Sequence, residues 1–150
     1  MALRSAGRAV IDASEVEAAS HFEPRPGAVE LLRRLSDRGV ALGLVTNNGR
    51  ECAERCLAQL PAAWCDDAIV SRDDVERWKP APDGLIRAAT AVLPDGGSLW
   101  FVGDSDADIE AARSARLQLS AIEICAVRVG DGDGDVVVAA LTELAARLPH

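Results

Sequence analysis

A pair of aspartates follows one of the apolar runs of the chain. Asp104 comes two residues after Val102, which ends the run, and Asp108 would lie in the first turn of a following helix. Two such carboxylates on one side of a sheet can converge on a hard cation, because Mg2+ prefers a few carboxylates together with water and phosphate oxygens. Asp106 and Asp108 can instead complement the dipole at a helix N-terminus. Taken alone, this motif leaves both interpretations open.

Two further residues have the chemistry of an anion site. Thr46 directly follows the apolar run 40–45, and its hydroxyl and the backbone N–H groups at the next helix start could bind an anion. The alternative is an ordinary turn cap. Lys79 is the single lysine in a chain with 15 arginines, which indicates a need for a compact ammonium on a flexible stem rather than a planar guanidinium. Retention of one lysine by chance is the alternative.

Helical and strand patterns alternate along the chain and would position these residues. The runs 40–45 and 98–102 are continuous and apolar, as is typical of strands buried on both faces. The order predicts an α/β fold, a three-layer Rossmann-like parallel sheet with helices on both faces. Ligands of such sheets gather at the carboxyl ends of the strands, where Thr46 and Asp104 lie. The expected helices cover residues 28–38, 50–60, 82–93 and 108–115; the expected strands cover 40–45, 68–71, 98–102 and 122–129; residues 136–148 hold a strand or a helix.

Composition excludes several classes of partner. The net charge of -8 and the absence of a run of Lys or Arg argue against nucleic acid and against a membrane surface. No stretch reaches the roughly 18 apolar residues that a spanning helix needs, and the first ten residues lack the apolar segment of a secretion signal. We therefore expect a cytoplasmic protein.

Two other metal sites are disfavoured. The four cysteines contain no CxxC pair, and only two histidines are present, so a zinc site is poorly supplied. The acidic stretch 130–135 is similar to a calcium loop, but Val136 and Thr142 stand where such a loop needs Gly and Glu. We interpret this stretch as an acidic turn.

Three motifs together resemble the haloacid dehalogenase superfamily. Their order and their positions after two strands and before a helix match the hydroxyl, lysine and acidic motifs of that family. The resemblance covers about residues 23–116, and two smaller features look like its phosphoglycolate phosphatase-like branch. The motifs are Thr46-Asn47, Lys79-Pro80 and Gly103-Asp-Ser-Asp-Ala-Asp108, and the smaller features are Pro26-Gly27 and Ala111-Ala112.

The resemblance implies a Mg2+-dependent phosphatase of small phosphorylated metabolites, in which an aspartate attacks phosphorus and forms an aspartyl-phosphate. Thr46 and the backbone of Asn47 would hold phosphate oxygens, and Lys79 would neutralise charge on the phosphate and the nucleophile. Asp104 would bind the metal directly, and Asp108 would hold Lys79 or the waters of the metal. The same motifs are compatible with dehalogenase or phosphonatase chemistry.

The first motif of the family, an apolar strand ending in Asp-x-Asp, has no clear counterpart before Thr46. The one candidate is Ala9-Val-Ile-Asp12, which would make Asp12 the nucleophile, but Ser14 then stands where a general acid is needed. The alternative makes Asp12 a helix cap. In that interpretation residues 1–22 are a helical remnant of the family's cap domain, and residues 23–150 form the phosphate- and metal-binding core.

This omission has a structural consequence, because in the family the first strand lies between the strands that end at Thr46 and Asp104. Unless residues 8–11 or another chain fill that place, both neighbours keep a row of unpaired backbone groups. Three functions remain open: a phosphatase that is incomplete in this chain, a non-catalytic binding or regulatory module, and a subunit whose sheet an oligomer or partner chain completes.

Overall fold

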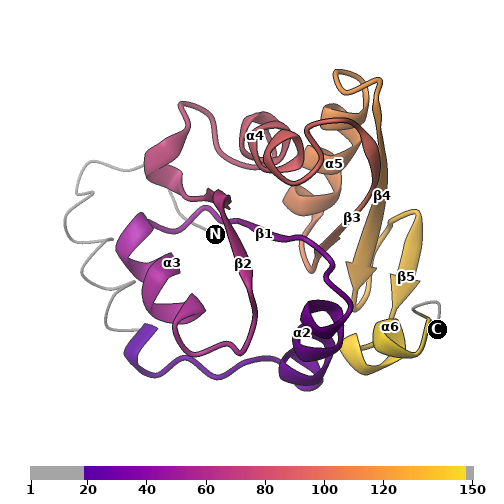
Figure 1. Ribbon diagram of the computed structural model, residues 1–150. Helices are drawn as coiled ribbons and strands as arrows, with labels where there is room; N and C mark the ends of the chain where they lie inside the picture. Colours follow the sequence, from indigo (N-terminus) through magenta and orange to yellow (C-terminus); the bar gives the residue numbers. More distant parts are fainter. Residues whose placement is uncertain (1–18, 148–150) are drawn as a thin grey trace.

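The computed structural model describes residues 19–147, so residues 1–18 of the predicted N-terminal segment, with the candidate nucleophile Asp12, lie outside the described residues. Helices and parallel strands alternate throughout that range (Figure 1). In chain order the elements are α2 (Ala28–Asp37), β1 (Leu42–Val45), α3 (Arg50–Leu57), β2 (Trp64–Val70), the 3-10 helix η1 (Arg72–Asp74), α4 (Asp83–Val92), β3 (Gly97–Gly103), α5 (Asp106–Arg116), β4 (Ile122–Val129), β5 (Val136–Val138) and α6 (Leu141–Arg147).

The strands of residues 19–147 form two separate parallel sheets. One sheet contains β1 and β2, and the other contains β3, β4 and β5 in that order. All pairs are parallel, as the alternation of elements predicted. β1 and β3 are each the edge strand of their sheet, and no strand among the described residues lies between them. The prediction about the first strand stays a prediction, because its candidate, residues 8–11, lies outside residues 19–147.

Helices cover both faces of the larger sheet, which confirms the three-layer architecture. On one face α4 and α5 pack against β4, and on the other face α2 and α6 pack against β4 and β5. Because side chains alternate along a strand, β4 supplies both cores. The first core includes Leu85, Ala89, Ile109, Ala112, Ile122 and Ile124, and the second includes Leu31, Val127, Val129, Val138 and Leu144. A third group of buried residues, Ala68, Val70 and Ala88, joins β2 to α4.

The expectation that the two apolar runs are buried on both faces is wrong. Trp100 is 43% exposed and Val102 is 38% exposed in β3, and Val40 before β1 is 44% exposed. A strand is fully buried only when it has a neighbour on each side and a covered surface above and below. β1 and β3 each lack one neighbour within residues 19–147, so their side chains stay partly accessible.

The other elements lie close to their predicted ranges. β4 has the predicted bounds, and residues 136–148 contain both a strand and a helix, β5 and α6. β2 begins at Trp64, earlier than predicted, because Asp66 and Asp67 interrupt the apolar pattern of this strand. A search of the described residues finds no helix long and apolar enough to cross a membrane.

Candidate functional site

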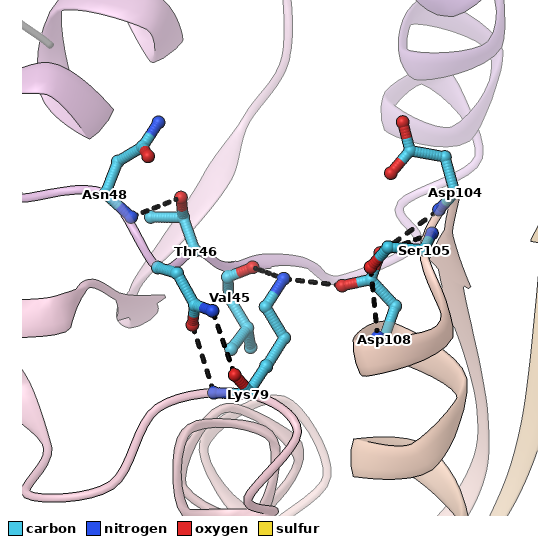
Figure 2. A network of polar contacts seen from close by, with 8 residues as sticks. Val45, Thr46, Asn48, Lys79, Asp104, Ser105 and Asp108 are labelled. Atoms are coloured by element: carbon cyan, nitrogen blue, oxygen red, sulfur yellow. Dashed lines mark hydrogen bonds and ion pairs between the residues drawn. The ribbon is translucent and has the colours of Figure 1, made fainter. Parts of the chain in front are cut away.

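Thr46 begins the turn that connects β1 to α3. Its backbone N–H donates to the Val70 carbonyl at 3.0 Å, which fixes the turn against β2. Its Oγ1 accepts a hydrogen bond from the Asn48 backbone N–H at 3.1 Å (Figure 2). A hydroxyl that accepts one bond can still donate its hydrogen. Thr46 is therefore both a turn residue and a donor at the carboxyl end of β1, so the two interpretations of this residue are compatible.

Asn47 joins this turn to the loop that carries Lys79. Its side-chain oxygen accepts from the Lys79 backbone N–H at 3.0 Å, and its side-chain nitrogen donates to the Lys79 carbonyl at 3.0 Å. These two bonds occupy both ends of the amide. They fix the side chain against the Lys79 loop and leave one hydrogen of the amide nitrogen unused by these two bonds. The group that the sequence resemblance indicated for an anion is the Asn47 backbone N–H.

The Lys79 ammonium lies between the ends of the two sheets. Nζ donates to the Val45 carbonyl at 3.0 Å and to Oδ1 of Asp108 at 2.6 Å, so it connects the end of β1 to the first turn of α5 (Figure 2). The side chains of Lys79 and Asp108 are 14% and 8% exposed. An ion pair shielded to this degree interacts more strongly than a pair in bulk water.

Asp108 is held from several directions. Its Oδ2 accepts the Asp104 and Ser105 backbone N–H groups, each at 3.1 Å, and the Ser105 hydroxyl at 2.8 Å. Ser105 Oγ in turn accepts the Asp108 N–H, which completes a capping box at the start of α5. Burial opposes the charge, but the Lys79 ammonium and the bonds from Ser105 outweigh it and hold the pKa of Asp108 below its ordinary value.

Gly103 allows this arrangement. A Cβ atom built on Gly103 would lie 2.3 Å from the Cβ atom of Asp108. The last residue of β3 can therefore carry no side chain while Asp108 keeps its position beneath the Asp104 N–H. This is a packing reason for the glycine in the acidic motif.

Asp104 differs from Asp108 in its surroundings. Its side chain is 51% exposed, and its carboxylate pairs with the Arg25 guanidinium at 2.5 Å. Within residues 19–147, no group of three or more His, Cys, Asp or Glu side chains could hold a metal ion. The oxygens of Asp108 are engaged by Lys79 and Ser105. The accessible carboxylates of the acidic motif are therefore those of Asp104, at the end of β3, and of Asp106, which is 94% exposed and pairs with Arg128 at 3.0 Å.

Sequence reasoning missed Arg72, which lies next to both loops of the site. It is 3% exposed, and its guanidinium lies 5.6 Å from the ring centroid of Trp78, the residue before Lys79. One of its nitrogens donates to the Asn47 carbonyl at 3.4 Å, and its backbone N–H donates to the Asn48 carbonyl at 2.9 Å. No spacing rule predicts that an arginine will be buried in this way. The contact of the exposed Arg25 with Asp104 is likewise not predicted by any local pattern.

The structure thus brings Thr46, Lys79, Asp104 and Asp108 to one edge, where the carboxyl ends of β1 and β3 meet (Figure 2). Their roles in catalysis are taken up below as proposals. Asp12 lies outside the described range, and no position relative to this edge is assigned to it.

Comparison with curated proteins supports a phosphatase family. The chain is 34% identical over 124 residues to validoxylamine A 7'-phosphate phosphatase of Streptomyces hygroscopicus subsp. limoneus, an alignment that covers 83% of this chain and 57% of the relative. It is 36% identical over 90 residues to phosphoglycolate phosphatase of Escherichia coli, covering 60% of this chain and 36% of the relative. The chain spans about half the length of the curated relatives it matches.

Solved structures show the same fold. A HAD-superfamily hydrolase of subfamily IA from Geobacter sulfurreducens superposes with a TM-score of 0.67 at 20% identity, covering 89% of this chain and 65% of that one. A HAD-superfamily hydrolase from Ehrlichia chaffeensis gives a TM-score of 0.63 at 21% identity, with 83% and 57% covered. The family model described as haloacid dehalogenase-like hydrolase matches residues 2–116. The chain therefore belongs to the haloacid dehalogenase-like hydrolase family.

Proposed function

We propose that this chain forms the phosphate- and magnesium-binding core of a phosphatase of small phosphorylated metabolites. The observation that carries the proposal is the position of the Lys79 ammonium, 3.0 Å from the Val45 carbonyl and 2.6 Å from Asp108. A phosphoryl group between the Thr46 turn and Asp104 would lie beside this cation. The names of the matched relatives, which are phosphatases of phosphorylated metabolites, support the same class of substrate.

The proposed phosphate site uses groups with hydrogens to donate. The Thr46 hydroxyl and the backbone N–H of Asn47 would hold two phosphate oxygens at the start of the turn before α3. The Lys79 ammonium has three hydrogens, and the two bonds described above use two of them. The third could pair with a phosphate oxygen and stabilise the charge that spreads over the transferring phosphoryl group.

Asp104 is the residue proposed to hold Mg2+. Its half-exposed carboxylate lies at the end of β3, and its partner Arg25 is itself more than half exposed, so a divalent ion could replace that contact. A bound Mg2+ would supply charge neutralisation and orient phosphate oxygens. Asp108 would act indirectly, by holding Lys79 in place. Asp104 alone would supply few ligands to Mg2+, which fits a site that shares the ion with a nucleophile and with the substrate.

The proposed reaction needs a carboxylate that residues 19–147 do not bring to this edge. In the family reaction an aspartate oxygen bonds to phosphorus while the bond to the leaving alcohol breaks, and water then hydrolyses the aspartyl-phosphate to inorganic phosphate. Asp12 is the candidate in this chain, and the alternative is that the chain alone lacks the nucleophile. We expect little turnover by the purified chain, together with retained binding of phosphate.

The binding part of the proposal is tested with tungstate, a phosphate analogue, by titration calorimetry in the presence of Mg2+. Lys79→Met should weaken tungstate binding by about tenfold or more, because one charge-assisted hydrogen bond is lost. The matched control is Arg77→Met, which removes a cation two residues away that pairs with Asp83 on the surface. Equal loss in both variants, or no loss in Lys79→Met, would contradict the proposed site.

The catalytic part is tested by turnover of p-nitrophenyl phosphate. Negligible turnover with intact tungstate binding would favour a binding core, whether it serves an incomplete phosphatase or a non-catalytic module. Strong turnover that Asp12→Asn abolishes would instead assign the nucleophile to the N-terminal segment and show that the cap-remnant interpretation is wrong.

A further inference from the structure

Asn47 takes part in both halves of the proposed phosphate site, through different groups. Its backbone N–H would hold a phosphate oxygen beside the Thr46 hydroxyl, and its side chain bonds to the backbone of Lys79. The side-chain oxygen accepts the Lys79 N–H and the side-chain nitrogen donates to the Lys79 carbonyl, each at 3.0 Å. One residue thus connects the anion-binding turn to the loop that carries the cation.

The two bonds fix the Lys79 backbone more firmly than one bond would. Both start from one planar amide, so they restrict the rotation of the loop relative to the turn as well as its distance. The loop has few other backbone donors, because Pro80 and Pro82 have no N–H and the Ala81 N–H bonds within the loop at 2.8 Å. The Lys79 N–H is therefore one of the few groups that can connect this loop to the turn, and Asn47 binds it.

The position of the Lys79 backbone matters for the ammonium because of the geometry at Nζ. This nitrogen is tetrahedral, with one bond to carbon and three to hydrogen. One hydrogen points to the Val45 carbonyl at 3.0 Å and another to Oδ1 of Asp108 at 2.6 Å (Figure 2). The direction from which the flexible stem arrives then decides where the third hydrogen points. That direction depends on the backbone that Asn47 holds.

We propose that Asn47 is a positioning residue, whose side-chain amide directs the third hydrogen of the Lys79 ammonium toward the bound phosphate. This inference rests on the phosphate site proposed above, and it gives the Asn47 side chain a role separate from that of its backbone N–H. Loss of the amide should therefore weaken anion binding through Lys79, and not only through the stability of the turn.

The chemistry of an amide fits this role better than that of a carboxylate. An aspartate at position 47 would accept the Lys79 N–H but would have no hydrogen for the Lys79 carbonyl, and its charge would oppose a bound anion. A glutamine has the same polar groups on a longer stem, which would displace the loop. Asn47→Ala is the substitution that removes both bonds without adding a charge.

The first experiment is a double-variant cycle of Asn47→Ala and Lys79→Met in the full chain. Tungstate affinity is measured by titration calorimetry with Mg2+, at a temperature where all variants are folded. Asn47→Ala alone should weaken binding about fivefold or more, because a misdirected ammonium loses a charge-assisted hydrogen bond. In the Lys79→Met background the same substitution should weaken binding less than about twofold, because the ammonium that the amide positions is absent.

Gln59→Ala is the matched control for this cycle. The Gln59 amide also makes two bonds to the backbone, to the Ala19 carbonyl at 3.2 Å and to the Arg55 carbonyl at 3.0 Å. It lies beyond the opposite end of α3 from the Thr46 turn. This variant should leave tungstate binding unchanged in both backgrounds, because it alters neither loop of the site.

The second experiment observes the ammonium by NMR. Lys79 is the single lysine of the chain, so isotope-labelled lysine gives one Nζ signal. The Lys79 side chain is 14% exposed and two of its Nζ hydrogens are bonded, so their exchange with water should be slow in the wild type. Asn47→Ala should speed this exchange about fivefold or more, and tungstate should shift the signal less than in the wild type. A purely structural asparagine would affect stability and leave the Nζ signal of the folded protein unchanged.

A loss of tungstate affinity that is smaller in the Lys79→Met background, together with faster Nζ exchange in Asn47→Ala, would support the proposal. An equal loss in both backgrounds, no loss in either, or an unchanged Nζ signal in Asn47→Ala would overturn it. Failure of the phosphate site itself is recognised separately, because Lys79→Met would then bind tungstate as well as the wild type does, or neither would bind it. The role proposed for Asn47 would be overturned together with that site.

Discussion

The Lys79 ammonium lies 2.6 Å from Oδ1 of Asp108, and this ion pair connects the loop before α4 to the first turn of α5. The loop belongs to the part of the chain that packs on β1 and β2, whereas α5 packs on the larger sheet. The pair therefore links the two sheets at the edge where their strands end. It holds the end of β1 close to the start of α5 although β1 and β3 are not paired with each other.

Removal of one partner of this pair should destabilise the fold. In Lys79→Met the Asp108 carboxylate, 8% exposed, keeps its charge without its counter-ion, which costs about 3 kcal/mol in the free energy of unfolding. The double variant Lys79→Met, Asp108→Asn should lose less than the sum of the single variants, because neither charge is left alone. Urea unfolding monitored by circular dichroism measures all three. Additive losses would show that the pair is energetically unimportant.

The same carboxylate should make stability depend on acid pH. Burial opposes the charge of Asp108, but Lys79 and Ser105 outweigh it, so the folded-state pKa lies below the unfolded value of about 3.9. The resulting stabilisation is fully present above about pH 4 and is lost as the pH falls through the folded-state pKa. The difference in unfolding free energy between the wild type and Asp108→Asn should stay constant from about pH 5 to 7 and shrink below about pH 4. A constant difference down to about pH 2 would contradict this.

The sequence predicted the elements and the edge that carries the site, because apolar runs and helix periods are local properties. For that reason the sequence places Thr46 and Asp104 at strand ends, where the structure has them. The two hydrogen bonds between Asn47 and Lys79 and the burial of Arg72 depend on which loops lie side by side in the fold. A local sequence pattern does not predict such contacts. The exposure of Trp100 was missed because an apolar run alone does not say whether its strand has neighbours on both sides.

Arg72 should act as a positioning residue for Lys79. It stacks on Trp78 and bonds to the Asn47 carbonyl, so its loss should loosen both loops of the site. We expect Arg72→Met to lower the free energy of unfolding by about 2 kcal/mol and to weaken tungstate binding several-fold. Arg72→Lys should restore only part of both, because an ammonium lacks the planar guanidinium. Titration calorimetry at a temperature where both variants are fully folded separates the effect on tungstate binding from the effect on stability. Unchanged tungstate binding would show that Arg72 has a structural role only.

Gly103 should tolerate no side chain. The added Cβ of Gly103→Ala would overlap Asp108, which must move, so stability should fall by about 2 kcal/mol and tungstate binding should fall with it. Gly39→Ala is the control, because Gly39 has a φ of +69° and no atom near the added Cβ. It should cost stability through backbone strain alone and leave binding intact. Loss of binding in both variants would mean that binding reports only on stability.

Arg25 should compete with Mg2+ for Asp104. Both side chains of this pair are more than half exposed, so Arg25→Gln should change the free energy of unfolding by no more than about 0.5 kcal/mol. Removal of the guanidinium leaves the carboxylate to the metal, and Mg2+ should then bind several-fold more tightly than to the wild type. Asp104→Asn should abolish the heat of Mg2+ binding in the same titration. Weaker Mg2+ binding by Arg25→Gln would show instead that Arg25 orients Asp104 toward the metal, and the two residues would then act together rather than in competition.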